Sequence, residues 1–182
     1  MAASINASTS AGVVTTADTS GNLNLQSNGT TKLAITSTGT AVAGTNTNDS
    51  AAAGYVGEYI EGVVAQGSAV SMTTGVAINV TSISLTAGDW DVSAIAKGAT
   101  GGSAVISWVR SSISTTSATY SDMAAFSNES SQTTVNIGGH SFGIPPVRFS
   151  LASTTTIYLT LQCAWTPGSF AGYGTLRARR VR

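Results

Sequence analysis

Thr156-Ile-Tyr-Leu-Thr-Leu-Gln-Cys-Ala-Trp165 is the stretch of sequence that decides the fold. Apolar residues occupy every second position in it, while Tyr158, Thr160 and Gln162 alternate with them. Successive side chains of a β-strand point to opposite sides, so a period of two indicates a strand with one buried face. The stretch therefore predicts a long strand whose buried face consists of Ile157, Leu159, Leu161, Cys163 and Trp165.

Cys163 lies on this predicted apolar face and is the only cysteine of the chain. A single cysteine can form neither an intrachain disulfide nor a cysteine-based zinc site. We therefore expect Cys163 to be a small hydrophobic residue of the core.

The alternating pattern recurs about every dozen residues on both sides of this stretch. From Val76 to Leu85 the alternation shifts register before Ile83, and from Trp90 to Ala96 it is regular. Between Ser103 and Ile113 we expect Ile106 and Trp108 on one side, with Val105 and Val109 on the other. Two more strands are predicted from Val147 to Leu151 and from Tyr173 to Arg182. Regularly spaced strands without helical stretches between them predict an antiparallel β-sandwich or jelly roll.

Composition supports an all-β fold and argues against disorder. Ser and Thr make up roughly three residues in ten, charged residues only 9%, and hydrophobic residues 42%, with a mean hydropathy of +0.20. Helices are usually solubilised by charged side chains, whereas Thr and Val suit strands, and disordered chains are poor in apolar residues.

Charge and hydropathy also exclude several kinds of partner. The formal net charge is zero, so no general attraction toward nucleic acid or an anionic membrane is expected. Residues 1–15 lack the basic start and apolar run of a signal peptide, and no stretch is long enough to span a bilayer. We expect a chain made in the cytoplasm, with neither nucleic acid nor membrane as a partner.

The first 48 residues differ from the rest of the chain. They contain short apolar alternations separated by turn signals, of which Asn28-Gly29 is the strongest hairpin signal. Each strand brings only one or two large apolar residues, too few for an independent core. We predict a dependent N-terminal β segment at residues 1–48, a hinge at 49–54 and a core-forming domain at 55–182. The apolar residues of the segment are Val13, Val14, Leu23, Leu25, Leu33 and Ile35.

Gly139-His140-Ser141-Phe142-Gly143 matches the G-x-S-x-G pattern of α/β-hydrolases. That motif requires a strand that turns sharply into a helix, yet Ile144-Pro145-Pro146 follows and disfavours a helix start. His140 is the only histidine and adjoins Ser141, so no partner remains for a catalytic triad. The sequence therefore predicts no enzymatic activity and no catalytic residues.

Acidic residues do not predict a metal site. Asp89 and Asp91 share a strand face, and Glu58 and Glu61 lie close in sequence, but no dense loop of oxygen ligands accompanies them. A solvated face or salt bridges are expected. No cofactor or metal is predicted.

Four arginines form a cluster at the end of the sequence: Arg177, Arg179, Arg180 and Arg182. The cluster lacks the interleaved aromatic residues of single-strand binders. We expect these side chains to pair with carboxylates of the same domain or of a neighbouring subunit.

Two stretches resemble known families. Ser10 to Thr30, continuing from Leu33 to Gly39, resembles the Thr/Gly/Asn-rich strands near the termini of tailed-bacteriophage virion proteins, both tail fibres and capsid attachments. Leu85-Thr-Ala-Gly-Asp-Trp-Asp-Val92 and Ser169-Phe-Ala-Gly-Tyr173 resemble two signatures of trimeric C1q/TNF-like jelly rolls, although Ala171 replaces the usual serine. The second resemblance implies a homotrimeric knob. Its subunit interface would include Phe170, Tyr173, Arg177 and Arg179.

The resemblances imply a virion structural protein. In the leading interpretation it is a capsid decoration, or cement, protein of the head-fibre kind. The residues Val13, Val14, Leu23, Leu25, Leu33 and Ile35 would anchor it on the major capsid protein at the capsid exterior. The alternative is a tail fibre or spike tip that binds a host-surface receptor through aromatic residues. The candidates for that role are Trp165, Phe170, Tyr120 and Phe126, for which filling the core is the competing interpretation.

Overall fold

The computed structural model describes residues 23–27, 29–36, 39–44, 47–102, 104–121, 126–130, 134–135 and 141–182. The chain forms two compact units, Met1–Asp49 and Ser50–Arg182. Val13, Val14 and His140, which the sequence analysis named, lie outside the described residues.

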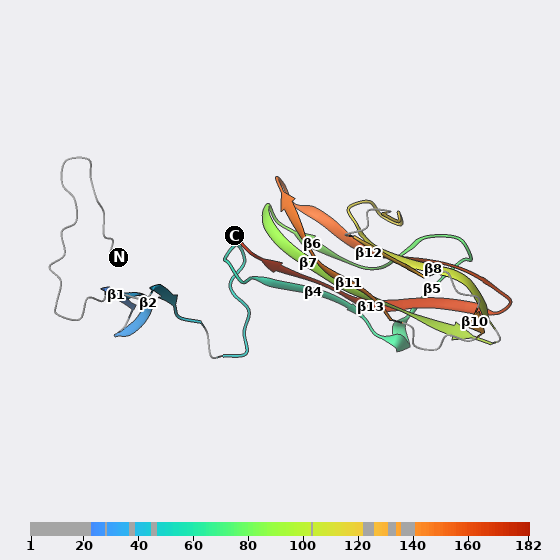
Figure 1. Cartoon of the computed structure of the whole chain (residues 1–182), viewed down its shortest axis with the longest axis horizontal. Helices are drawn as coiled ribbons and strands as arrows, with labels where there is room; N and C mark the ends of the chain where they lie inside the picture. The colour runs from blue at the N-terminus through green and yellow to red at the C-terminus, as the bar shows by residue number, and fades with distance from the viewer. Residues whose placement is uncertain are drawn as a thin grey trace. The chain divides into compact units, whose positions relative to one another are not determined.

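The described residues of the first unit form a small antiparallel sheet, in the order β1-β2-β3 (Figure 1). Its strands are β1 (Leu23–Ser27), β2 (Thr30–Thr36) and β3 (Gly39–Val42). Ser27 pairs with Thr30, and Gly29 between them has a φ of 73°, which glycine adopts without strain. This pairing confirms the predicted hairpin, although Asn28 itself lies outside the described residues.

The second unit is a sandwich of two antiparallel sheets (Figure 1). One sheet has the order β11-β7-β13-β4, with β5 also paired to β13, and the other has the order β10-β8-β12-β6, with β9 also paired to β8. The short 3-10 helix η1 (Gln66–Ser68) lies in the connection from β4 to β5. The strands are β4 (Tyr59–Val64), β5 (Val70–Ser71), β6 (Ile78–Leu85), β7 (Gly88–Gly101), β8 (Val105–Ser114), β9 (Ser127–Ser130), β10 (Thr134–Val135), β11 (Ser141–Leu151), β12 (Thr155–Thr166) and β13 (Ser169–Arg180).

The pairing of these strands is nested in the way that defines a jelly roll. The first long strand of the unit pairs with the last, β4 with β13, and inside this pair β6 pairs with β12, β7 with β11 and β8 with β9. A long hairpin rolled up on itself gives this order. The predicted all-β fold, with an antiparallel sandwich as its main domain, is confirmed.

The stretch from Thr156 to Trp165 belongs to β12, which lies between β8 and β6 in its sheet. Its five predicted apolar side chains are all buried, so the alternation between its two faces is confirmed. Cys163 is fully buried, and burial raises the pKa of its thiol to about 12, which keeps it protonated and unreactive. Trp90, Val92, Ala94 and Ala96 of β7 face the same core, as predicted.

Several strand faces and boundaries differ from the predictions, among them the start of β11, which lies at Ser141 and not at Val147. In β8 the register shifts opposite Ala164 and Trp165, which places Ile106 and Val109 together in the core, because a bulge lets residues three apart share a face. The prediction that they face opposite sides is therefore wrong. Val76 is exposed and precedes β6, whereas the predicted register shift within that strand is confirmed by its pairing with β12. The last strand begins at Ser169, four residues earlier than predicted.

Phe170 packs inside its own sandwich, with 2% of its surface exposed and its ring centroid 5.5 Å from that of Trp165. Two glycines that pair across β7 and β13, Gly98 and Gly172, leave room for side chains of the core. A Cβ atom on Gly98 would lie 2.1 Å from Phe170 Cζ, and one on Gly172 would lie 2.8 Å from Leu161 Cδ2. The absence of a side chain at these two positions is therefore a packing requirement of the core.

The strand β11 forms one edge of its sheet. Its pairing with β7 shifts register between Ile144 and Val147, where Pro145 and Pro146 lie. Proline has no N–H for a ladder hydrogen bond and occurs in sheets at edges and bulges. The two prolines therefore fit this edge and would not fit an interior strand.

Candidate functional site

The small sheet of the first unit gathers the predicted anchor residues on one face. Leu23 pairs with Ile35 and Leu25 with Leu33 across β1 and β2, and Leu33 pairs with Val42 across β2 and β3. Directly paired residues project on the same side of a sheet. We call the resulting surface the apolar face, and it consists of Leu23, Leu25, Leu33, Ile35 and Val42.

The apolar face is poorly covered within the described part of the chain. Leu23 and Ile35 are each 44% exposed, Leu25 is 40% exposed and Val42 is 75% exposed. No residue of β1 to β3 whose burial is described is fully buried. A three-stranded sheet with so little buried apolar surface gains little stability of its own.

Val42 is a functional candidate that sequence reasoning missed. Gly39–Val42 contains only one large apolar residue, so its sequence carries no visible alternation. The signal available was the turn at Ser37-Thr-Gly39 after a predicted strand, which leaves room for a hairpin partner.

The outer face of the sheet β11-β7-β13-β4 carries three of the four residues predicted at a subunit interface. Burial alternates along β13, so that Tyr173, Arg177 and Arg179 project outward with the exposed Ile95 of the neighbouring β7. Phe170 does not join them. Because it is enclosed by its own chain, we remove it from the proposed interface.

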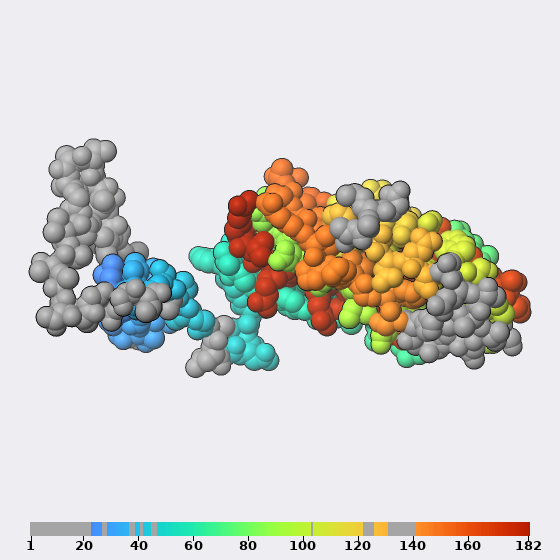
Figure 2. Space-filling view, in the orientation of Figure 1, coloured from blue at the N-terminus to red at the C-terminus, as the bar shows by residue number. Residues whose placement is uncertain are grey.

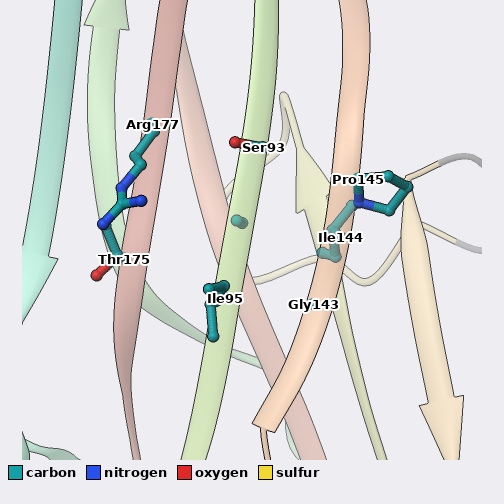
Figure 3. Close-up of a pocket in the computed structure, with 8 residues that line it drawn as sticks. Ser93, Ile95, Gly143, Ile144, Pro145, Thr175 and Arg177 are labelled. Carbon is teal, nitrogen blue, oxygen red and sulfur yellow. The ribbon is translucent and has the colours of Figure 1, made fainter.

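This outer face contains a hollow with a volume of about 360 Å³ (Figure 3). Figure 3 shows Ser93 and Ile95 on one strand, Thr175 and Arg177 on a second, and Gly143 to Pro145 on a third. Gly143 and Ser93 leave the hollow open because neither carries a large side chain, and a Cβ atom on Gly143 would meet nothing within 4 Å. The hollow is mostly apolar, with Arg177 as its charged residue.

Three of the four C-terminal arginines pair with carboxylates of their own unit. Arg177 Nε donates to Glu61 Oε1 at 2.7 Å, Arg180 Nε donates to Glu58 Oε2 at 2.9 Å, and Arg182 bonds Asp89. The prediction of carboxylate partners is thus confirmed for these three within one chain. Arg179 is exposed and forms no ion pair with the residues that the structure describes.

The pair of Arg180 and Glu58 is almost fully buried and well satisfied. Arg180 also donates to Ala87 O at 2.9 Å, bonds the Thr86 hydroxyl, and lies over the Trp90 ring at 4.2 Å from its centroid. Burial raises the pKa of Glu58, but the Gly54 N–H and the Arg180 guanidinium outweigh it, so the pKa is lowered overall. This pair joins the beginning of the second unit to its end. Figure 2 shows these two segments, turquoise and dark red, side by side.

Asp89 is a second buried carboxylate that joins distant parts of the unit. Arg148 Nη2 on β11 donates to both of its oxygens at 3.0 Å, and Arg182 bonds it from beyond β13. Chiefly because of the hydrogen bond from Arg148, then that from Ser150, the pKa of Asp89 is lowered to about 2, despite the opposing effect of burial. Of the two predicted outcomes, a solvated face or a salt bridge, Asp89 adopts the salt bridge.

The described part of the hydrolase-like motif, Ser141 to Gly143, lies on the extended strand β11. Ser141 begins β11 and pairs with Lys97, Phe142 is buried, and Gly143 pairs with Ile95. A nucleophile elbow would need a strand-to-helix turn at this serine. Among the residues that the structure describes, no group of three or more His, Cys, Asp or Glu side chains could hold a metal ion. In the same residues, no helix is long and apolar enough to cross a membrane.

The aromatic residues considered for receptor binding are mostly packed against their own unit. Trp165 and Phe170 belong to the core, and the Phe126 ring meets that of Phe149 edge to face at 5.2 Å. Filling the core, the competing interpretation, is confirmed for Trp165 and Phe170. Tyr120 is half-buried and its ring faces Arg110.

The fold places the second unit among the jelly-roll β-sandwiches. No family model matches this chain, and no curated protein matches it. Among solved structures, it is similar to a chain of the T13 particle of infectious bursal disease virus, with 13% identity over 68% of this chain and a TM-score of 0.41. It is also similar to a chain of the Gx strain of that virus, with 11% identity over 68% of this chain and a TM-score of 0.39.

The chain spans about a third of the length of those two viral chains, 31% and 30%. Both likenesses are too distant to carry an argument about family or function.

Proposed function

We propose that this protein is a virion structural protein of the capsid-decoration, or cement, type. The observation that carries the proposal is the apolar face of the first unit, which gathers five large aliphatic residues on a sheet whose described residues include none that is fully buried. The second unit has an extensive hydrophobic core of its own. This division suits a chain whose first unit attaches to the capsid and whose second unit is displayed on the outside.

The attachment would bury the apolar face on the major capsid protein. Covering the exposed half of such a side chain contributes roughly 1 kcal/mol, about half the value for full burial. A sheet edge of this unit can also add main-chain hydrogen bonds to an exposed edge of the shell. A ligand that binds only the assembled lattice disfavours disassembly by mass action, which is how cementing would stabilise the shell.

We further propose that the jelly-roll unit forms a homotrimer through the outer face of the sheet β11-β7-β13-β4. Tyr173, Arg177, Arg179 and Ile95 provide a surface of mixed apolar and charged character. Three linked anchors would bind a capsid far more tightly than one, because the second and third attachments are intramolecular.

The anchor is tested by binding of the purified protein to particles stripped of it, measured by co-sedimentation. The double variant Leu25→Asp/Ile35→Asp introduces two charges on the apolar face and should abolish binding. The matched control is Asn24→Asp, which places a charge on the opposite face of the same strand and should bind like the wild type. A double variant that still decorates particles would refute the assigned anchor.

The alternative is a tail fibre or spike tip that recognises a host-surface receptor. The two functions differ in copy number, which quantitative gels of purified virions measure. Hundreds of copies per particle would exclude a tail tip, and a handful would exclude a cement protein.

A further inference from the structure

The sheet β10-β8-β12-β6 presents an arginine held between two aromatic rings on its outer face. The Cζ atom of Arg110 lies 4.1 Å from the centroid of the Tyr120 ring and 5.1 Å from that of Trp108. Trp108 and Arg110 are two residues apart on β8 and share a face, while Tyr120 comes from the segment after that strand. Cation–π contact with both rings restricts the position of the guanidinium.

A hydrogen bond from its Nε atom also restrains this guanidinium. Arg110 Nε donates to Gln162 Oε1 at 2.9 Å, and Gln162 Nε2 donates to Gly75 O at 2.7 Å. The amide of Gln162 is thus oriented by its own partner, and Arg110 pairs with it directly across β8 and β12. Only one of the three guanidinium nitrogens is used in this way.

The remaining two nitrogens, Nη1 and Nη2, have no hydrogen-bond or ion-pair partner among the residues that the structure describes. In this respect Arg110 differs from Arg148, Arg177, Arg180 and Arg182, which each pair with a carboxylate. Glu129 lies opposite Arg110 on β9 and forms no ion pair with it. A positioned planar pair of donors without a partner is suited to bidentate binding of a carboxylate.

Arg110 lines a hollow with a volume of about 640 Å³, which is within the range of small-molecule sites. Arg110 and Gln162 lie on strands of the sheet, with Gly75 to Ala77 and Ala118 to Tyr120 from two loops. The lining offers carbonyl, hydroxyl, amide and aromatic groups. These are the groups that bind the hydroxyls and ring faces of a sugar.

The second loop is held in place, so that the hollow is already formed. Asn79 Oδ1 accepts a hydrogen bond from Ala118 N and Asn79 Nδ2 donates to Ser117 Oγ, both at 2.7 Å. Ser121 N donates to Ser112 Oγ at 2.9 Å. Ala118, at the rim, has a φ of 48° and is the one non-glycine residue with positive φ in the described part of the chain. Such backbone strain persists where surrounding contacts impose it.

We propose that this hollow binds an acidic saccharide, with Arg110 pairing with the sugar carboxylate through Nη1 and Nη2. Arg110 is the only cation that lines the hollow, so the site matches a single carboxylate better than a phosphate chain. Tyr120, Thr119 and Gln162 would contact the ring and its hydroxyls. The proposal goes beyond capsid attachment and does not depend on it.

The test is a calorimetric titration of the full chain with four probes. Two are acidic, the methyl glycoside of N-acetylneuraminic acid and methyl glucuronide, and two are controls, the neutral methyl glucoside and sodium acetate. At least one acidic sugar should bind with an affinity in the millimolar range or tighter, and at least about tenfold more tightly than either control. Failure of both acidic sugars to bind, equal binding of the glucoside, or equal binding of acetate would each overturn the proposal.

Variants then place the binding at Arg110. Arg110→Gln should weaken it at least about tenfold, and Arg110→Lys should also weaken it because a lysine cannot form the planar pair. Arg148→Gln removes an arginine from the other sheet and should leave binding unchanged.

Glu129→Gln changes an exposed side chain, which makes it the variant least disturbing to the fold. It should tighten binding about twofold or more at low salt, because it removes a negative charge opposite Arg110. Binding that is unaffected by Arg110→Lys and Glu129→Gln would refute Arg110 as the carboxylate partner, even if Arg110→Gln failed to fold.

Discussion

At the scale of single residues, Gly98 shows how closely the core is packed. The Phe170 ring occupies the space that any side chain at position 98 would need. The glycine and the aromatic residue are 72 positions apart in the sequence, and only the pairing of β7 with β13 brings them together. The sequence alone therefore left Phe170 between two interpretations, a subunit interface and the core.

We predict that Gly98→Ala destabilises the protein by about 1–3 kcal/mol, the usual cost of overpacking a core. The matched control is Gly143→Ala, where a Cβ atom meets open space on an edge strand, and a change within about 0.5 kcal/mol is expected there. Urea denaturation of both variants measures the difference. Equal stabilities of the two variants would contradict the packing role of Gly98.

Asp89 gives the protein a predictable response to acid. Its lowered pKa, about 2 against an ordinary value of 3.8, means that the ionised form favours the folded state. This contribution is complete above the unfolded value and is lost as the pH falls from about 4 through 2. Glu58, whose pKa is also lowered, adds to the same trend.

We expect the urea midpoint of the wild type to fall between pH 4 and pH 2. The Asp89→Asn variant should be less stable at pH 7 and show a flatter profile across that window. Asp91→Asn changes an exposed neighbour on the same strand and should follow the wild type. An Asp89→Asn profile as steep as that of the wild type would assign the acid response to other groups.

At the scale of strands, the sequence predicted the buried face wherever every second residue of a strand is apolar. The apolar face of β12 and the regular part of β7 follow from alternation, because each strand faces one core along its whole length. The faces of β8 did not follow, since a bulge opposite Ala164 and Trp165 changes the alternation without changing residue types. A bulge depends on the partner strand, which a local pattern does not contain.

The candidate sites were also predictable only where a local sequence pattern determines them. Leu23, Leu25, Leu33 and Ile35 were predicted as anchors because they alternate along short strands that bring too few apolar residues for a core of their own. Arg110 was missed because its site depends on the register of β8 with β12 and on the course of the loop that carries Tyr120. Neither of these is visible in a single sequence.

At the scale of the whole molecule, the proposed trimer is the feature that light scattering can decide. We expect a mass three times that of the 18.2 kDa chain at micromolar concentration. Ile95→Glu places a charge in the middle of the outer face and should give a folded monomer, because a buried unpaired charge is costly at an interface. Ser84→Glu, on an exposed position of the other sheet, should remain trimeric. A wild type that is monomeric would rule out the proposed interface.

The two prolines of β11 matter most where copies of the chain crowd together. On a crowded particle surface, two unpaired strand edges of neighbouring jelly rolls could come close enough to form backbone hydrogen bonds with each other. Pro145 and Pro146 interrupt the row of donors on one such edge, so two edges cannot join in register there. On the proposed capsid surface, this feature would keep neighbouring copies from pairing through the β11 edge.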